Sequence, residues 1–198
     1  ARNIDSALDL NDSKVCVQAN TTTQLNLADY FRANNMKYTE MKFDKLDDVV
    51  KAYDSGQCDT LTSDASQLYA LRLNLSKPND HTILADIISK EPLAPVVRLR
   101  DDDWMMIVKW TLCAMINAEE LGITSKNIDE ALKSKKPEVM RLVGTEGSYS
   151  EDHGLTKDWA VRIIRHVGNY GEVYDRNVGA DSRLKIPRGM NQLWNAGG

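Results

Sequence analysis

Short runs of β-branched and other apolar residues alternate with apolar residues at helical spacing along the first part of the chain. We expect strands at residues 14–18, 38–43 and 58–62. A helical stripe follows each run, and the three stripes contain Leu25, Ala28 and Phe31; Leu46, Val49, Val50 and Tyr53; and Leu68, Leu71 and Leu73. Parallel strands need crossover connections, which are usually helices. The alternation therefore predicts an α/β fold with a parallel-rich sheet.

The second part of the chain shows mainly helical patterns. Two extended runs come first, at residues 81–88 and 93–98, and Pro92 separates them. Helices are then expected from Asp101 to a stop before Gly122, at residues 128–134 and 137–143, from a Thr156 cap through Tyr170, and at residues 188–194. The helix after Thr156 would place four apolar residues on one face: Trp159, Ile163, Val167 and Tyr170. We expect an α/β unit at residues 11–90, then a crossover strand and a mostly helical part at residues 91–198.

Charge and hydropathy argue against two classes of protein. The chain has 25 basic and 29 acidic residues and a net charge of −4, whereas non-specific nucleic-acid binders usually carry a basic domain or stripe. No stretch approaches the roughly 18 uninterrupted apolar residues that indicate a membrane-spanning helix. We therefore expect neither a nucleic-acid partner nor insertion into a membrane.

The sequence does not determine whether the three cysteines are free thiols or form a disulfide. Cys16, Cys58 and Cys113 show neither a Cys-x-x-Cys motif nor the Cys/His spacing of a zinc site. One disulfide with one buried thiol, or three buried thiols, are both compatible with the composition. The sequence thus gives no indication of a metal site.

Catalytic motifs are also missing from the sequence. His81, His153 and His166 do not lie near a Ser or Cys in a nucleophile motif, and no metalloprotease or phosphate-loop motif is present. Asp101, Asp102 and Asp103 could suggest a cation site, but acidic residues at the start of a helix are explained more simply by the helix dipole. We expect no enzymatic activity and no cofactor.

The segment from Asn20 to Thr23 follows the first predicted strand directly and begins the first predicted helix. Such a helix points free backbone N–H groups, and the positive end of its dipole, at the crevice beyond the carboxyl end of the strand. Thr21, Thr22 and Thr23 add hydroxyl donors for a carboxylate or a phosphate. The alternative is that one Asn or Thr only caps the helix while the others are solvated.

Thr62, Ser63 and Asp64 end the third predicted strand, so we expect them at the same sheet edge as the three threonines of the first turn. An aspartate beside an anion site would suit a zwitterion. The ligand carboxylate would bind at the helix N-terminus, and the ligand ammonium would bind Asp64. The alternative is that Asp64 is another helix cap.

Several longer motifs together resemble one family. They are residues 15–31, 56–59 (GQCD), 63–64 (SD), 87–93 (IISKEPL) and 167–172 (VGNYGE). In this order they are similar to the general L-amino-acid-binding proteins of bacterial ABC importers, which are type II periplasmic solute receptors. The resemblance runs along essentially all 198 residues. It implies a periplasmic receptor whose two lobes close on an amino acid at a hinge.

The resemblance also implies which part of such a receptor this chain represents. The chain starts where the first lobe crosses into the second, so residues 11–90 would form the complete second lobe. The absent first lobe would supply the arginine that clamps the ligand carboxylate, and the helical remainder would normally pack on it. A missing N-terminal fragment or a second copy would then cover the apolar stripes of Trp104, Ile107, Leu112, Trp159 and Ile163.

Site residues are carried over from the resemblance position by position. Thr21, Thr22 and Asp64 resemble ligand-contacting positions, and Thr23 and Ser63 are further candidates. In addition, Asn20 stands where relatives usually have glycine. Asparagine tolerates the left-handed conformation, so the turn would survive, while its side chain would narrow or re-tune the pocket.

A disulfide is the second consequence of the resemblance. A periplasmic location permits disulfides, and Cys16 and Cys58 would lie at similar depth in neighbouring strands. We therefore expect a Cys16–Cys58 bond and expect Cys113 to be a buried free thiol.

The expected function is that of the substrate-binding component of an importer, which captures L-amino acids in the periplasm and delivers them to the membrane permease. The alternative is a ligand-sensing effector domain of a transcription regulator with the same fold. Such a regulator would need a DNA-binding helix-turn-helix segment, which this sequence does not show. A dehydratase-like enzyme of the same fold group would need an acid/base pair in the cleft, and none is visible in the sequence.

Overall fold

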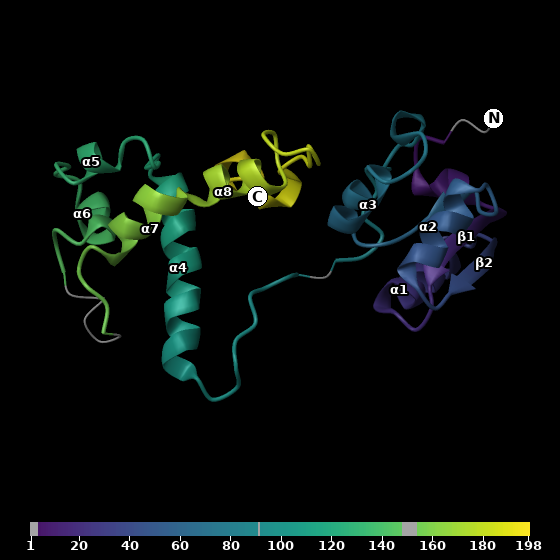
Figure 1. The fold of residues 1–198 in the computed structure, drawn as a ribbon, viewed down its shortest axis with the longest axis horizontal. Coiled ribbons are helices and arrows are strands. Elements are labelled where there is room, and N and C mark those ends of the chain that lie inside the picture. The colour runs from purple at the N-terminus through teal and green to yellow at the C-terminus, as the bar shows by residue number, and fades with distance from the viewer. Residues whose placement is uncertain (1–3, 91, 148–153) are drawn as a thin grey trace. The chain divides into compact units, whose positions relative to one another are not determined.

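The computed structural model describes residues 4–90, 92–147 and 154–198. The chain divides into two compact units, Ala1–Pro92 and Leu93–Gly198 (Figure 1). Among the residues singled out above, His153 lies outside the described ranges.

The first unit is built on a three-stranded parallel sheet, which confirms the α/β prediction. Strand β1 (Ser13–Gln18) lies in the middle, between β2 (Tyr38–Phe43) and β3 (Thr60–Leu61). β3 is shorter than the predicted run of residues 58–62, although its neighbours still pair with β1. Asp59 N donates to Lys14 O at 2.9 Å, and Thr62 N donates to Cys16 O at 3.1 Å.

Two helices cover opposite faces of this sheet. Helix α1 (Thr22–Ala33) packs Leu27 and Phe31 against Val15 and Val17. Helix α2 (Leu46–Asp54) packs on the other face, because successive side chains of a strand point to opposite sides. The prediction for Leu25 was wrong: it is 66% exposed, because the buried stripe of α1 runs through Leu27 and Phe31 instead.

The remaining elements of the first unit are short. They are the 3₁₀ helices η1 (Ala7–Leu10) and η2 (Pro78–Asp80), and helix α3 (Ala65–Arg72), which follows β3. The crossover strand expected after this unit does not form, and the described residues between 81 and 98 contain no strand. Pro92 and Pro95 lack the backbone N–H group that a ladder requires, and Val96 is 95% exposed.

The second unit is helical in its described part (Figure 1). Helix α4 (Asp102–Glu120) begins as predicted at Asp101, whose carboxylate accepts a hydrogen bond from Trp104 N at 3.3 Å. Helices α5 (Ile128–Ala131) and α6 (Pro137–Val143) follow, and α6 has the predicted proline at its start. The buried core of this unit consists of Ala118, Ile123, Ile128, Val139, Val143, Val161 and Ile164.

The helix expected from Thr156 through Tyr170 is in fact two helices, α7 (Trp159–Val167) and α8 (Tyr170–Asn177). The cap prediction was wrong, because the Thr156 hydroxyl donates to the Asp158 carboxylate at 2.6 Å and α7 begins after Asp158. Gly168, at φ +94°, ends α7. The face predicted for this helix was also wrong, because α7 buries Ala160, Val161 and Ile164, whereas Val167 is 43% exposed. The chain ends with η4 (Gly189–Asn191) and η5 (Trp194–Ala196) in place of the predicted helix at residues 188–194.

A polar network joins the start of α8 to the loop after α4. The Glu172 carboxylate accepts hydrogen bonds from Asn169 N at 2.9 Å and from the Ser125 hydroxyl at 2.6 Å. The Asn169 side chain donates to Ile123 O at 2.9 Å. Burial alone would raise the pKa of Glu172, but the hydrogen bonds from Ser125 and Asn169 outweigh it and leave that pKa below its ordinary value.

Candidate functional site

The turn between β1 and α1 adopts the strained backbone that the sequence suggests. Asn20 has φ +59°, which lies in the left-handed region that asparagine tolerates better than most residues. Its backbone N–H donates to the side-chain oxygen of Gln24 at 2.9 Å. The turn is therefore held by the first turn of α1, and the chain enters the helix at Thr21.

Thr21 is the N-cap of α1, so the capping alternative is correct for this residue. Its hydroxyl oxygen accepts a hydrogen bond from Gln24 N at 3.2 Å, and the hydroxyl donates to Gln18 O at 2.8 Å. Thr22 and Thr23 lie before the first intrahelical bond, which runs from Leu25 N to Thr21 O. The Thr21 hydroxyl is therefore engaged in capping the helix.

Asp64 stands at the N-cap position of α3 but makes no side-chain cap hydrogen bond. Its backbone carbonyl accepts from Leu68 N at 2.9 Å, while its carboxylate has no hydrogen-bonding or ion-pair partner in the described part of the chain. The capping alternative for this side chain is therefore wrong. A carboxylate left without a partner is available to a cation from outside the chain.

One hollow of about 230 Å³ brings the two segments together. Thr21, Thr22 and Thr23 line it from the start of α1, and Ser63 and Asp64 line it from the end of β3. Both segments lie beyond the carboxyl ends of neighbouring parallel strands, where ligands of open α/β sheets bind. Asn20 is not among the lining residues, so its influence on the hollow is through the backbone turn.

Four further residues line the hollow and were not named as candidate ligand residues. Thr62 follows β3 and was expected at this sheet edge, and extending the same argument to the end of β1 would have found Gln18. Leu46 begins α2, and Gln67 lies in the first turn of α3. Gln67 lies three residues after the Asp64 cap, a helical spacing that could have indicated it, whereas the place of Leu46 depends on how α2 packs on the sheet.

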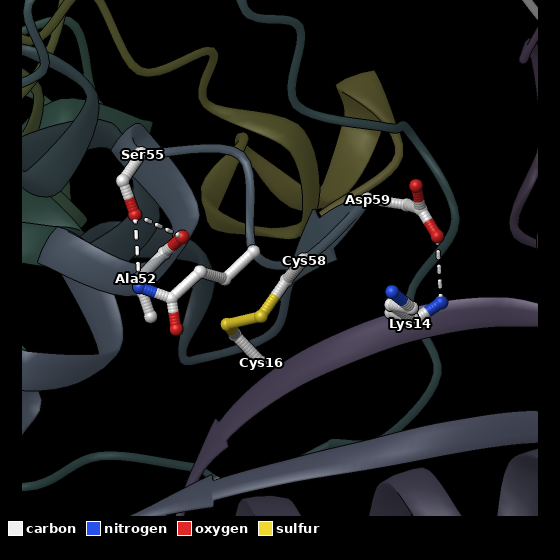
Figure 2. The surroundings of a disulfide bond; sticks show 7 residues. Lys14, Cys16, Ala52, Ser55, Cys58 and Asp59 are labelled. Carbon is white, nitrogen blue, oxygen red and sulfur yellow. Dashed lines mark hydrogen bonds between the residues drawn. A yellow bond between two sulfur atoms is a disulfide. The ribbon is translucent and has the colours of Figure 1, made fainter.

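The Cys16–Cys58 disulfide is present and lies in the same unit as the hollow (Figure 2). The two Cα atoms are 5.7 Å apart, and both residues are buried in a cluster with Val49 and Ala52 on the α2 face of the sheet. Beside it, Lys14 N donates to the Asp59 carboxylate at 2.7 Å (Figure 2). The bond thus joins the middle of β1 to the segment that enters β3.

Cys113 is a free thiol, as expected, but it is only partly buried, so the prediction of a buried thiol was wrong. It lies on the face of α4 that borders a mainly apolar groove of about 650 Å³ within the second unit. Trp110, Leu142 and Trp159 also line this groove, and Trp104 on the same helix is 52% exposed. The helices of this unit therefore leave apolar surface uncovered.

The described residues contain neither a candidate metal-binding cluster nor a candidate membrane-spanning helix. No cluster of three or more His, Cys, Asp or Glu side chains there could hold a metal ion. None of the helices in those ranges combines the length and the apolar character needed to cross a bilayer.

No family model matches this chain, but individual proteins do. YhdW of Escherichia coli (strain K12), whose name places it among amino-acid ABC transporter-binding proteins, is 56% identical over 196 residues. The general L-amino acid-binding periplasmic protein AapJ of Rhizobium johnstonii is 54% identical over 198 residues. The glutamate/glutamine/aspartate/asparagine-binding protein BztA of Rhodobacter capsulatus is 44% identical over 196 residues.

A solved structure shows the same fold. It is an ABC transporter periplasmic binding protein from Brucella ovis with glutathione bound, which matches with a TM-score of 0.89 and 52% identity and is covered to 62% by this chain. The matches cover 98 to 99% of this chain but only 58% of the length of the three curated relatives. None of these proteins is a transcription regulator, so the regulator alternative has no support here.

Proposed function

This chain is homologous, over nearly its whole length, to amino-acid-binding proteins of ABC transporters, and on that premise we propose that it forms the ligand-binding part of such a receptor. In this proposal the receptor captures L-amino acids in the periplasm and delivers them to the membrane permease. It performs no catalysis.

The observation that carries the proposal is that one hollow contains both the N-terminus of a helix and a carboxylate without a partner in the described part of the chain. The start of α1 presents Thr22 and Thr23 with the positive end of the helix dipole. Asp64 faces the same hollow and makes no hydrogen bond to its own helix. A ligand with an α-carboxylate and an α-ammonium matches this pair of charges, with the ammonium on Asp64.

Free amino acids and glutathione satisfy the same charge pattern. Glutathione, which occupies the Brucella ovis neighbour, carries a free α-amino and α-carboxylate group on its γ-glutamyl residue. We therefore propose that the hollow binds the amino-acid head group. The rest of the ligand decides between a free amino acid and a γ-glutamyl peptide.

A second wall completes the site in this proposal. Residues 11–90 act as one lobe, and residues 91–198 contribute to the other lobe together with a segment corresponding to the part of the relatives that this chain does not match. That segment, rather than a second copy, covers the apolar surface around Trp104 and Trp110. Without an opposing wall, the affinity of this chain for free amino acids is millimolar or weaker.

Titration by NMR tests the head-group site. Addition of L-glutamate or glutathione should shift the amide resonances of Thr22, Thr23 and Asp64. Asp64→Asn should abolish the response, whereas Asp80→Asn, which makes the same change at an exposed position in η2, should leave it intact. In a receptor with both lobes, where Asp64 is buried against the ligand, the loss in affinity should reach about 10² to 10³. Micromolar binding by a monomer of this chain would refute the proposed second wall.

A further inference from the structure

Gln67 lines the same hollow as Asp64. It is the third residue of α3 and lines the hollow together with Ser63 and Asp64. Its side chain is partly buried.

A hydrogen bond within the hollow orients the Gln67 amide. The Ser63 hydroxyl donates to the Gln67 side-chain oxygen. This bond assigns the oxygen to Ser63 and leaves the amide NH₂ as the free end, with two protons to donate. In the described part of the chain no acceptor is bonded to that NH₂ group.

The polar lining of the hollow disfavours ligands with apolar side chains. Of its nine lining residues, only Leu46 is apolar, and the others carry hydroxyl, amide or carboxylate groups. An aliphatic ligand side chain packed on such a wall would leave the donors that it covers without hydrogen-bond partners, which costs free energy. A ligand side chain with its own oxygen acceptor avoids this cost.

We infer that Gln67 is a specificity-determining residue that donates from its amide to an oxygen of the ligand beyond the amino-acid head group. It selects ligands with a side-chain carboxylate, carboxamide or γ-glutamyl carbonyl over aliphatic amino acids. The inference rests on the proposed function, because it assumes that the head group binds between the start of α1 and Asp64. Ser63 acts as the positioning residue, since its hydroxyl fixes which end of the amide faces the ligand.

The test compares two ligands of similar length, L-glutamine and L-norleucine, by NMR titration of this chain. The native chain should bind L-glutamine about tenfold more tightly, the factor expected for one hydrogen bond of about 1.4 kcal/mol. Gln67→Leu, which keeps a strong helix former in α3, should bring the ratio of the two dissociation constants close to unity. Gln57→Leu makes the same substitution at an exposed position between α2 and β3 and should leave the ratio unchanged.

A second variant tests whether the effect of Gln67→Leu comes from the lost hydrogen-bond donor or from the introduced apolar side chain. Gln67→Glu removes the donor and adds a negative charge, so it should weaken L-glutamate more than L-glutamine. An unchanged L-glutamine to L-norleucine ratio in Gln67→Leu, or equal effects on L-glutamate and L-glutamine in Gln67→Glu, would overturn the role of Gln67 alone. If neither L-glutamine nor L-norleucine shifts the resonances of Thr22, Thr23 and Asp64 in the native chain, the head-group site itself fails, and this inference fails with it.

Discussion

Reduction of the Cys16–Cys58 bond should destabilise the first unit strongly. The cleanest comparison uses the Cys113→Ala chain, oxidised and reduced, because the two forms then contain the same side chains. The bond closes a segment with a sequence separation of 42, and for a loop of that length the chain-entropy model gives about 4 kcal/mol. Packing changes little, since both sulfur atoms stay in the cluster with Val49 and Ala52.

Urea unfolding measures this loss, provided that the probe reports on the correct unit. All four tryptophans lie after residue 100, so their fluorescence reports on the second unit. The first unit should be followed through the amide resonances of Val15 and Val17 on the central strand. With an m-value of about 1 to 2 kcal/mol/M, reduction should lower its midpoint by roughly 2 to 4 M urea.

Two results would refute this reasoning. A shift worth less than about 1 kcal/mol would show that the bond does not restrict the unfolded chain as the entropy model requires. Three free thiols, counted in the native sequence under denaturing and non-reducing conditions, would show that the bond is absent. One free thiol, that of Cys113, is the expected count.

Three further predictions concern the second unit. Gly144 has φ +75°, and an added Cβ would lie 1.9 Å from Lys157 O. Gly122 has a similar φ of +68°, but the space around it is open, so Gly122→Ala should cost only the backbone penalty of about 1 to 2 kcal/mol. Gly144→Ala should therefore lower the free energy of unfolding clearly more than Gly122→Ala does. Thermal unfolding of both variants checks this, and equal losses would contradict it. Glu172 has a lowered pKa in the folded chain, so its stabilisation is complete above its unfolded pKa of about 4.5 and is lost as pH falls through the folded value. Urea unfolding between neutral and acid pH should therefore show a shallower pH dependence in Glu172→Gln, and an unchanged slope would contradict the assignment. Arg188 forms a bidentate pair with Glu119 at 2.9 and 3.1 Å and stacks on Tyr170 and Tyr174, so Arg188→Lys should lower the free energy of unfolding by about 1 to 3 kcal/mol, whereas Arg183→Lys should not change it.

The sequence predicted correctly those helices and strands whose ends are set by nearby residues. The β2 segment and helix α6 were predicted with their exact ends, because aromatic and β-branched residues mark the strand and a proline opens the helix. Thr156 was mistaken for a cap because its hydroxyl pairs with Asp158, a choice that residue type alone does not reveal. The runs at residues 81–88 and 93–98 have strand-like composition, but a strand also needs a bonded partner, which the described chain does not provide.

Some residues of the candidate site could be predicted from the sequence, and others could not. Thr21, Asp64 and their neighbours follow strands directly, so the carboxyl-edge rule and the family resemblance both place them in the hollow. Leu46 lines it from the start of α2, whose position depends on packing on the sheet, and Gln67 lines it from the first turn of α3. The sequence also could not predict whether the Asp64 carboxylate makes a capping hydrogen bond, because residue type and position are the same whether or not that bond forms.

The central place of β1 in the sheet has a consequence for the order of folding. β1 comes first of the three strands along the chain, but both of its neighbours come later, and its pairing with β3 joins Cys16 to Leu61. At about 5 to 20 residues per second, synthesis takes roughly 2 to 9 s to make the residues between these partners. Throughout that time Val15, Cys16 and Val17, which are buried in the folded unit, lack one of the layers that cover them. A newly made chain thus exposes its most buried strand for seconds, during which a chaperone can bind it and a neighbouring chain can pair with it.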